Sequence, residues 1–313
     1  VFGEFLAGAE QHIAHLGSSI GAWRMTAACH PDAARQMAQF RSVYLSMEFE
    51  ATRRPSRITR DSYRVLERMF SPQARAAILS NPKRSLHILA VRGHGLCGAK
   101  NIAAEGVGLL RAAAANKSSR QSLARHYERA VLSSRMDEVF DWPEDFGQVH
   151  GALSADSLFD ALMASGSIPA VVSPIKNLAG MPEGLYRDGG IIDYHFAAPP
   201  CISAPHLDEG AGLSLYPHFY PTLVPGWFDK KLTGRHRNPA EIDSMLLLSP
   251  SEEFVKSLPG HKIPDRKDFS RMSEAERVAY WTRVADESER LADEFSQLLQ
   301  DHGSFMDRLE KAA

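Results

Sequence analysis

The stretch of sequence that decides the fold runs from residue 12 to residue 29 and reads HIAHLGSSIGAWRMTAAC. Residues 12–16 indicate a short strand, and residues 22–29 indicate a helix. Between them, Gly17-Ser18-Ser19-Ile20-Gly21 forms a tight turn that matches the pattern G-x-S-x-G. A serine held where a strand turns into a helix is the arrangement of many hydrolytic nucleophiles. The segment therefore predicts an α/β protein with Ser19 as its nucleophile.

Glycines flank this serine for a steric reason. Side chains two residues before and two residues after Ser19 would collide with it, so we expect glycine to be required at Gly17 and Gly21. The helix that follows points its N-terminus at the serine, where its free N–H groups favour an oxyanion. An isolated match to this pattern is most often a plain turn. The strand before it and the helix after it favour the catalytic interpretation here.

Asp188-Gly189-Gly190, far downstream, suggests a base for Ser19. Alone, this tripeptide is typical of a hairpin turn. The residues before it change the interpretation. Residues 158–170, LFDALMASGSIPA, indicate a helix that leads through small residues to a proline, and a short apolar segment follows.

Together these segments resemble the patatin-like phospholipases, in which a helix ending in A-S-x-A-x-P precedes an apolar segment and D-G-[GA]. Here the corresponding sequence is MASGSIPAVVSPI…YRDGGIID, with Gly166 and Ser167 as small variations. The resemblance covers most of residues 2–193. It implies a lipid acyl hydrolase of the phospholipase A or esterase type. Ser19 would attack the ester and Asp188 would be the base, with no histidine required.

The resemblance also implies a fold, a site and partners. The fold would be a three-layer α/β/α sandwich with a central, mostly parallel sheet. Gly17, Gly21, Gly189 and Gly190 would shape the site around the two reacting groups. The partners would be a lipid substrate and a membrane surface, without a cofactor or a metal.

One element of the family pattern, the glycine-rich oxyanion loop G-G-G-x-[RK]-G, is absent from the sequence. Residues 1–8 resemble the helix that immediately follows this loop in the family. We therefore expect the loop to lie just upstream of Val1. The link from Leu6 to Ser19 is also shorter than in the family pattern, which is consistent with a missing segment near Gln11.

The remaining sequence predicts strands alternating with helices, which favours a layered α/β fold. We expect a short helix over 1–10, mostly helix over 31–79, a strand over 86–91, helices over 99–130 and 156–165, ordered loop over 199–240 and a buried strand over 244–248. A capping box begins at Ser273, and apolar residues at helical spacing then predict one long amphipathic helix to residue 299. We interpret residues 1–313 as one domain, with 200–313 as a C-terminal extension packed on the core.

Composition argues against several other classes of protein. Of the 313 residues, 44% are hydrophobic and 24% are charged, and the formal net charge is −2. A nucleic-acid-binding protein would normally be more basic. Cys29, Cys97 and Cys201 are too few and too scattered for a disulfide framework or a zinc site. Since no apolar run reaches the ~18 residues of a spanning helix, we expect a protein that is cytoplasmic or peripheral to a membrane.

Two other functional interpretations stay open. The first is an α/β-hydrolase triad in the order Ser…Asp…His, which would join Ser19 and Asp188 to His195, His206 or His218. The second is a non-catalytic relative that binds a lipid or another partner. The first predicts that one histidine is as essential as Ser19, and the second predicts no turnover.

Four further signals have a structural interpretation that we prefer. GHGLCG (93–98) fits G-x-G-x-x-G, but no acidic residue follows at the distance that dinucleotide binding requires. Apolar residues between 168 and 178 could line an acyl groove, but most fit the core. Residues 213–237 could form a lid in which Trp227 and Phe228 enter lipid, but they fit a packed loop. His12 and His15 are expected to be partly buried and hydrogen-bonded.

Overall fold

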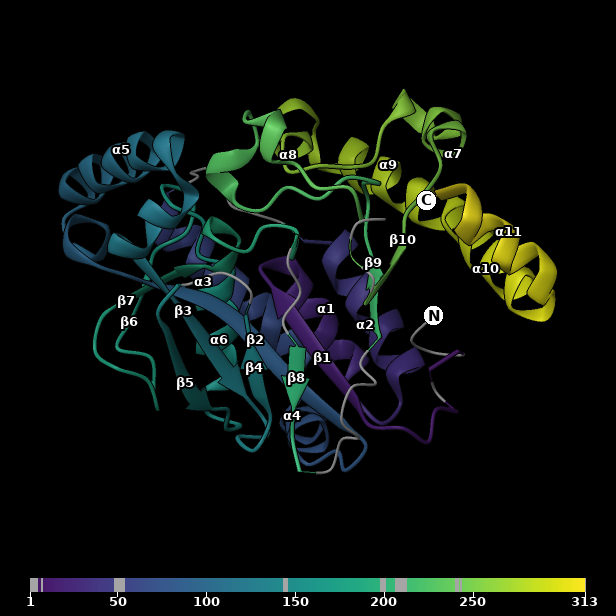
Figure 1. Ribbon diagram of the computed structural model, residues 1–313, viewed down its shortest axis with the longest axis horizontal. Helices are drawn as coiled ribbons and strands as arrows, with labels where there is room; N and C mark the ends of the chain where they lie inside the picture. The colour runs from purple at the N-terminus through teal and green to yellow at the C-terminus, as the bar shows by residue number, and fades with distance from the viewer. Residues whose placement is uncertain are drawn as a thin grey trace.

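The fold is seen in a computed structural model that describes residues 5, 6, 8–47, 54–142, 146–197, 201–205, 213–239, 242 and 244–312. Its strands are β1 (Ile13–Ser18), β2 (Arg84–Gly93), β3 (Tyr127–Ser133), β4 (Val139–Asp141), β5 (Gln148–Ala152), β6 (Ile175–Lys176), β7 (Leu185–Asp188), β8 (Cys201–Ser203), β9 (Ser214–Pro217) and β10 (Met245–Leu248). Its α-helices are α1 (Ile20–Ala28), α2 (Ala33–Leu45), α3 (Pro55–Met69), α4 (Pro72–Leu79), α5 (Ile102–Ser118), α6 (Leu158–Ser165), α7 (Glu252–Ser257), α8 (Asp268–Arg271), α9 (Glu274–Glu287), α10 (Glu289–Gln300) and α11 (His302–Ala312). Figure 1 shows strands β1, β2, β3 and β5 running side by side, with α5 at the upper left and α9, α10 and α11 towards the right.

The central sheet is mixed and is organised around β2. Its strand order is β5-β3-β2-β7-β6, and β1 also pairs with β2. The β1·β2 and β3·β5 pairs are parallel, whereas β2·β3, β2·β7 and β6·β7 are antiparallel. The α/β class is therefore confirmed, but the expectation of a mostly parallel sheet is wrong.

The antiparallel course of β3 has a local cause. The expected helix over 99–130 ends early, because α5 stops at Ser118 and a 3₁₀ helix, η2 (Arg120–Arg125), follows it. Together they return the chain to the end of the sheet at which it left β2. The His94 N–H donates to the His126 carbonyl at 2.8 Å there, so β3 can only run back along β2.

Both faces of the sheet are covered. Since successive side chains of a strand point to opposite faces, Leu86, Ile88 and Ala90 of β2 join a core with α1, α2, α3 and α6. On the other face Val91 packs in a cluster with residues of α5 and η2, and Leu89 packs against Phe140 of β4. β2 is consequently buried over most of its length.

Three further expectations need correction. The helix predicted over 1–10 is not seen, because Phe5, Leu6 and Gly8 lie in turns, and residues 1–4 and 7 lie outside the described part of the chain. The strand β10 is only half-buried and pairs with β9 in a separate parallel sheet. The expected single helix over 273–299 is divided at Ser288, whose hydroxyl donates to the Ala285 carbonyl at 2.6 Å and so competes with the helical backbone.

The C-terminal helices contact the body mainly through α9. The capping box at Ser273 and Glu276 starts this helix as expected. Trp281 stacks on Tyr44 of α2 with ring centroids 6.0 Å apart, and the Arg277 guanidinium donates to the Met47 carbonyl. These contacts fix the start of the C-terminal part against α2.

Candidate active site

Ser19 occupies a strained turn between β1 and α1. Its backbone angles are φ 55° and ψ −132°, and it is the N-cap residue of α1. A non-glycine residue with such angles costs of the order of 1–3 kcal/mol and persists only where surrounding contacts hold it. Here the Ser19 N–H donates to the Ser165 hydroxyl at 2.8 Å, and Ser165, which is fully buried, donates to the Leu89 carbonyl at 2.5 Å.

Sheet topology brings Asp188 to Ser19. β1 and β7 pair with the same edge of β2, one parallel and the other antiparallel, so they approach each other end to end. Ser18 lies opposite Leu89, and Asp188 lies opposite the next residue of β2, Ala90. As a result the Ser19 Oγ–H donates to Asp188 Oδ2 at 2.7 Å.

The Asp188 carboxylate is buried and hydrogen-bonded through both oxygens. The second one, Oδ1, accepts the Gly190 N–H at 2.8 Å, and the side chain is held by the turn that the sequence predicted. Burial raises the pKa of Asp188 from 3.8 to about 6, against the opposing effects of the Ser19 and Gly190 hydrogen bonds and of the cations Lys230 and Arg266. Near neutral pH this group is an ionised carboxylate that is unusually ready to accept a proton.

The flanking glycines do not all have the role expected of them. A Cβ on Gly17 would lie 2.5 Å from the Ala22 Cα, and a Cβ on Gly189 would lie 2.6 Å from both the Leu89 carbonyl and the Ser18 hydroxyl. Glycine is required at both positions. A Cβ on Gly21 would meet no described atom within 4 Å, so the expected steric need for glycine there is wrong.

Ser165 is a residue of the site that the sequence did not predict. In the sequence it is one small residue of the helix end MASGSIP, yet it connects the nucleophile backbone to the central strand. The same segment supports Asp188, because the Ser167 carbonyl accepts the Asp188 N–H at 3.2 Å. The small residues of this segment are the signal that could have indicated a close approach of two backbones.

Two histidines of the triad interpretation, His195 and His218, make hydrogen bonds to other groups. Hydrogen-bond partners of Ser19 and Asp188 among the described residues include no histidine. The buried His195 ring accepts the Val224 N–H at 3.1 Å, and burial lowers its pKa to about 3. His218 accepts the Tyr220 N–H at 3.1 Å, and His206 lies outside the described residues.

The remaining sequence signals lie in packed or hydrogen-bonded parts of the fold. Within GHGLCG, a Cβ on Gly93 would lie 2.3 Å from the Cys97 carbonyl oxygen, so this glycine serves a tight turn. His12 bonds the Ser85 hydroxyl at 3.1 Å, and burial lowers the pKa of His15 to about 4. Between 168 and 178, Val172 and Leu178 are buried in the main core, whereas Val171 is 37% exposed.

Part of the segment 213–237 packs on the core, whereas Leu213, Phe219 and Tyr220 are exposed. Asp229 is fully buried and accepts hydrogen bonds from Asn116 at 2.8 Å and from Arg235 at 3.0 Å. Phe228 packs beside the cluster under α5, and Trp227 is only half-exposed. The buried carboxylate therefore anchors the segment that carries Lys230.

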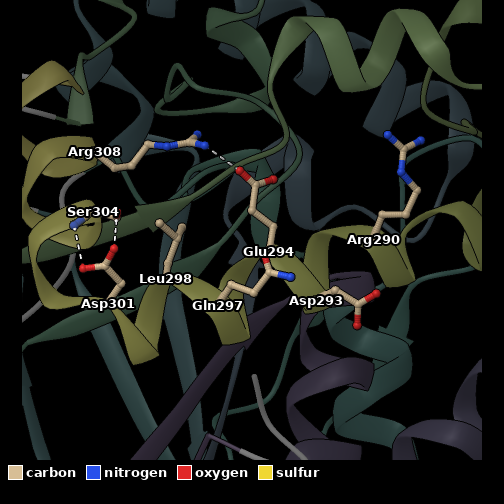
Figure 2. A pocket seen from close by; sticks show the side chains of 8 residues that line it. All are labelled: Arg290, Asp293, Glu294, Gln297, Leu298, Asp301, Ser304 and Arg308. Atoms are coloured by element: carbon tan, nitrogen blue, oxygen red, sulfur yellow. Dashed lines mark hydrogen bonds and ion pairs between the residues drawn. The ribbon is translucent and has the colours of Figure 1, made fainter.

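A groove of about 680 Å³ lies between α10 and α11. Figure 2 shows two pairs among its polar side chains: Arg308 with Glu294, and Ser304 with Asp301. Apart from Leu298, every side chain that lines it is polar or charged. The hydrogen bond from Ser304 to Asp301 in this groove is exposed, unlike the one from Ser19 to Asp188. The groove also offers no apolar lining for an acyl chain.

Comparison with known proteins assigns no family: no family model, no curated protein and no solved structure matches this chain. Among the described residues, no group of three or more His, Cys, Asp or Glu side chains could hold a metal ion. Within the same part of the chain, none of the helices is both long and apolar enough to cross a membrane. Functional inference therefore rests on the geometry of Ser19 and Asp188.

Proposed function

We propose that this chain is a serine ester hydrolase that cleaves carboxylic esters of lipids, with a patatin-like arrangement of its sheet and helices. The observation that carries the proposal is the 2.7 Å hydrogen bond from the Ser19 hydroxyl to the buried Asp188 carboxylate. It joins the two residues that the resemblance to patatin-like phospholipases names as nucleophile and base. The strained turn at Ser19 supports it, because such strain gathers at functional sites.

In the proposed reaction Asp188 takes the Ser19 proton as Oγ attacks the ester carbonyl. The alcohol or lysolipid leaves with a proton returned by Asp188, and an acyl-enzyme remains. Water, deprotonated by the same carboxylate, then releases the fatty acid and restores Ser19. One carboxylate thus serves both half-reactions.

The charge that develops on the ester oxygen needs hydrogen-bond donors. α1 begins immediately after Ser19, and the first N–H groups of a helix together with its positive dipole end stabilise a nearby anion. The Ser19 N–H itself is occupied by Ser165. The resemblance assigns the other hydrogen-bond donors to the glycine-rich loop.

The dyad is preferred to a triad because the two side chains already touch. A histidine base would have to stand between serine and aspartate, as in the Ser-His-Asp template, and the 2.7 Å contact leaves no space for a ring. A direct aspartate base is weak at its ordinary pKa of 3.8, but burial raises the pKa of Asp188 to about 6, which brings it closer to the pH of the reaction.

The test is covalent labelling with a fluorophosphonate, followed by mass mapping, together with turnover of a nitrophenyl acyl ester. We expect the adduct on Ser19, and Ser19→Ala should abolish both signals. Ser18→Ala is the matched control, because the Ser18 hydroxyl is buried without a hydrogen-bond partner among the described residues. Asp188→Asn should slow labelling by about 10²-fold or more.

Three results would contradict the proposal. Turnover that survives Ser19→Ala excludes this nucleophile. Turnover lost as fully in His195→Ala or His218→Ala as in Ser19→Ala replaces the dyad by a triad. Absence of both labelling and turnover in the unaltered protein favours the non-catalytic binder.

A further inference from the structure

The helix α5 exposes its large apolar side chains and buries its small and polar ones. Ile102 is 79% exposed, Leu110 73% and Val107 46%, and their spacing places them on one side of the helix. The buried side chains lie on the opposite side and belong to Glu105, Gly108, Ala112 and Asn116. A surface helix of a globular protein ordinarily has the reverse arrangement.

Three inward contacts fix this orientation of α5. The Arg187 guanidinium donates to both carboxylate oxygens of Glu105, with Nε 2.6 Å from Oε1. A Cβ on Gly108 would lie 2.7 Å from the backbone of the 3₁₀ helix η1 (Gly95–Gly98), so the two helices lie directly against each other. Near the end of α5, Asn116 donates to Asp229 at 2.8 Å. The helix cannot turn its apolar side chains inward without breaking these contacts.

Positive charge surrounds the outer face of α5 without balancing negative charge. Between residues 94 and 126 the sequence contains a single acidic residue, Glu105, and its carboxylate is buried against Arg187. The exposed cations of this stretch that form no ion pair with another described residue are Lys100, Arg111, Lys117 and Arg125. The face therefore suits a partner that combines an apolar layer with negative charge.

Charge and size decide between the partners that such a face could bind. A second copy of this chain would bring the same cations against one another, and like charges repel. A stable interface with another protein needs about 800 Å² from each partner, and a single convex helix supplies only part of that area. A lipid surface has no such requirement, because a few apolar side chains can enter it while cations meet anionic headgroups.

We propose that the outer face of α5 docks on an anionic lipid surface. Ile102, Val107 and Leu110 enter the apolar layer, and the cations around them contact the headgroups. The inference goes beyond the proposed function and does not depend on it, because the face is built from residues other than those of the Ser19–Asp188 site. Figure 1 shows α5 at the upper left, on the side away from α10 and α11.

Flotation with vesicles tests the surface in the Ser19→Ala protein, which leaves the lipid intact. The vesicles contain phosphatidylcholine, either alone or mixed with phosphatidylserine. On the mixed vesicles we expect Ile102→Gln and Leu110→Gln each to weaken binding by about tenfold, because each withdraws an aliphatic side chain from the apolar layer. Arg111→Gln should weaken binding about fivefold on the mixed vesicles and leave binding to phosphatidylcholine unchanged.

Matched controls come from exposed positions elsewhere on the surface. Leu213→Gln removes a leucine that is 68% exposed, and Arg68→Gln removes an exposed arginine of α3. Neither should change vesicle binding, and circular dichroism of every variant should match that of the parent. Insertion itself is seen with Leu110→Trp, whose added fluorescence should shift to shorter wavelength on the mixed vesicles, whereas that of Leu213→Trp should not.

Several outcomes would overturn the proposal. Losses as large in Leu213→Gln and Arg68→Gln as in the α5 variants would mean general attraction to the vesicle. Undiminished binding in the double variant of Ile102→Gln and Leu110→Gln would remove the face from the contact. A dimer in sedimentation that becomes a monomer in Leu110→Gln, without vesicle binding, would assign the face to a protein interface instead.

The same proteins keep this inference distinguishable from the proposed function. With Ser19 intact, a chain that binds vesicles through α5 but hydrolyses no ester disproves the hydrolase and keeps the docking surface. Turnover of a soluble nitrophenyl ester by a chain that binds no vesicle disproves the docking surface and keeps the hydrolase.

Discussion

Replacement of Asp188 by asparagine should make the folded protein more stable at neutral and alkaline pH, although it removes the proposed base. Burial raises the pKa of Asp188 from 3.8 to about 6. Because one unit of pKa difference between the folded and unfolded states corresponds to about 1.4 kcal/mol, ionised Asp188 lowers the free energy of unfolding by about 3 kcal/mol.

The sign of this change in the free energy of unfolding follows from the protons that the folded and unfolded states bind. Between about pH 4 and pH 6 the folded state keeps the Asp188 proton while the unfolded state has lost it. The free energy of unfolding therefore falls as the pH rises through this window and is constant above it. Asparagine carries no charge at any pH. It can keep both contacts, since its oxygen can accept the Gly190 N–H and its amide can donate to the Ser19 hydroxyl.

The assay is urea unfolding followed by tryptophan fluorescence, at about pH 4.5 and about pH 8, on the variant and the unaltered protein. Other carboxylates titrate in this range, so the quantity of interest is the variant-minus-parent difference, which should grow by about 2 kcal/mol between the two pH values. Asp193→Asn is a control for which we expect a stability change of the opposite sign. It breaks a buried pair with Arg129, whose two hydrogen bonds are 2.7 and 2.9 Å long, and should destabilise by several kcal/mol. A variant-minus-parent difference for Asp188→Asn that is negative at about pH 8, or equal at both pH values, would refute the reasoning.

The remaining predictions concern the turn and its chemistry. Gly17→Ala should destabilise the fold by more than about 2 kcal/mol through the clash with α1, whereas Gly21→Ala should leave stability within about 1 kcal/mol of the parent; thermal unfolding of the pair decides whether the two glycines differ. Ser165→Ala should leave the Ser19 N–H without its partner, which costs about 1–3 kcal/mol and should slow fluorophosphonate labelling of Ser19. A labelling rate in Ser165→Ala equal to that of the parent would show that this hydrogen bond does not position the nucleophile. The kcat/KM for a nitrophenyl ester should rise with pH and level off above about pH 6, because the ionised Asp188 is the proposed base; a profile that is flat between about pH 5 and pH 7 would exclude Asp188 from that role.

Local patterns in the sequence predict the elements whose structure is determined by residues that are neighbours in the sequence. β1, the turn at Ser19 and α1 follow from one short run of residues, and the capping box at Ser273 begins α9 as expected. β3 is not predicted, because YERAVLS continues an alanine-rich helical stretch and is buried at nearly every position, so it has no alternation to indicate a strand. The expectation of a mostly parallel sheet was wrong for the same reason.

Contacts between distant residues lie beyond such patterns. The Ser19–Asp188 pair joins residues separated by 169 positions, and the contact of Ser19 with Ser165 spans 146. The first could be predicted only because the whole order of segments resembles a known family. The second could not, because a buried serine that connects two backbones looks in sequence like any small residue at a helix end.

The topology of the sheet also explains why the site costs stability. Because β1 and β7 meet end to end along one edge of β2, serine and aspartate approach each other directly, and a histidine has no place between them. The aspartate must then act as a base by itself, and it can do so only where burial raises its pKa. The same burial makes its ionised form unfavourable to the folded state. Loss of activity and gain of stability in Asp188→Asn are therefore two consequences of one arrangement, and observing both in a single variant would connect the sheet topology to the proposed chemistry.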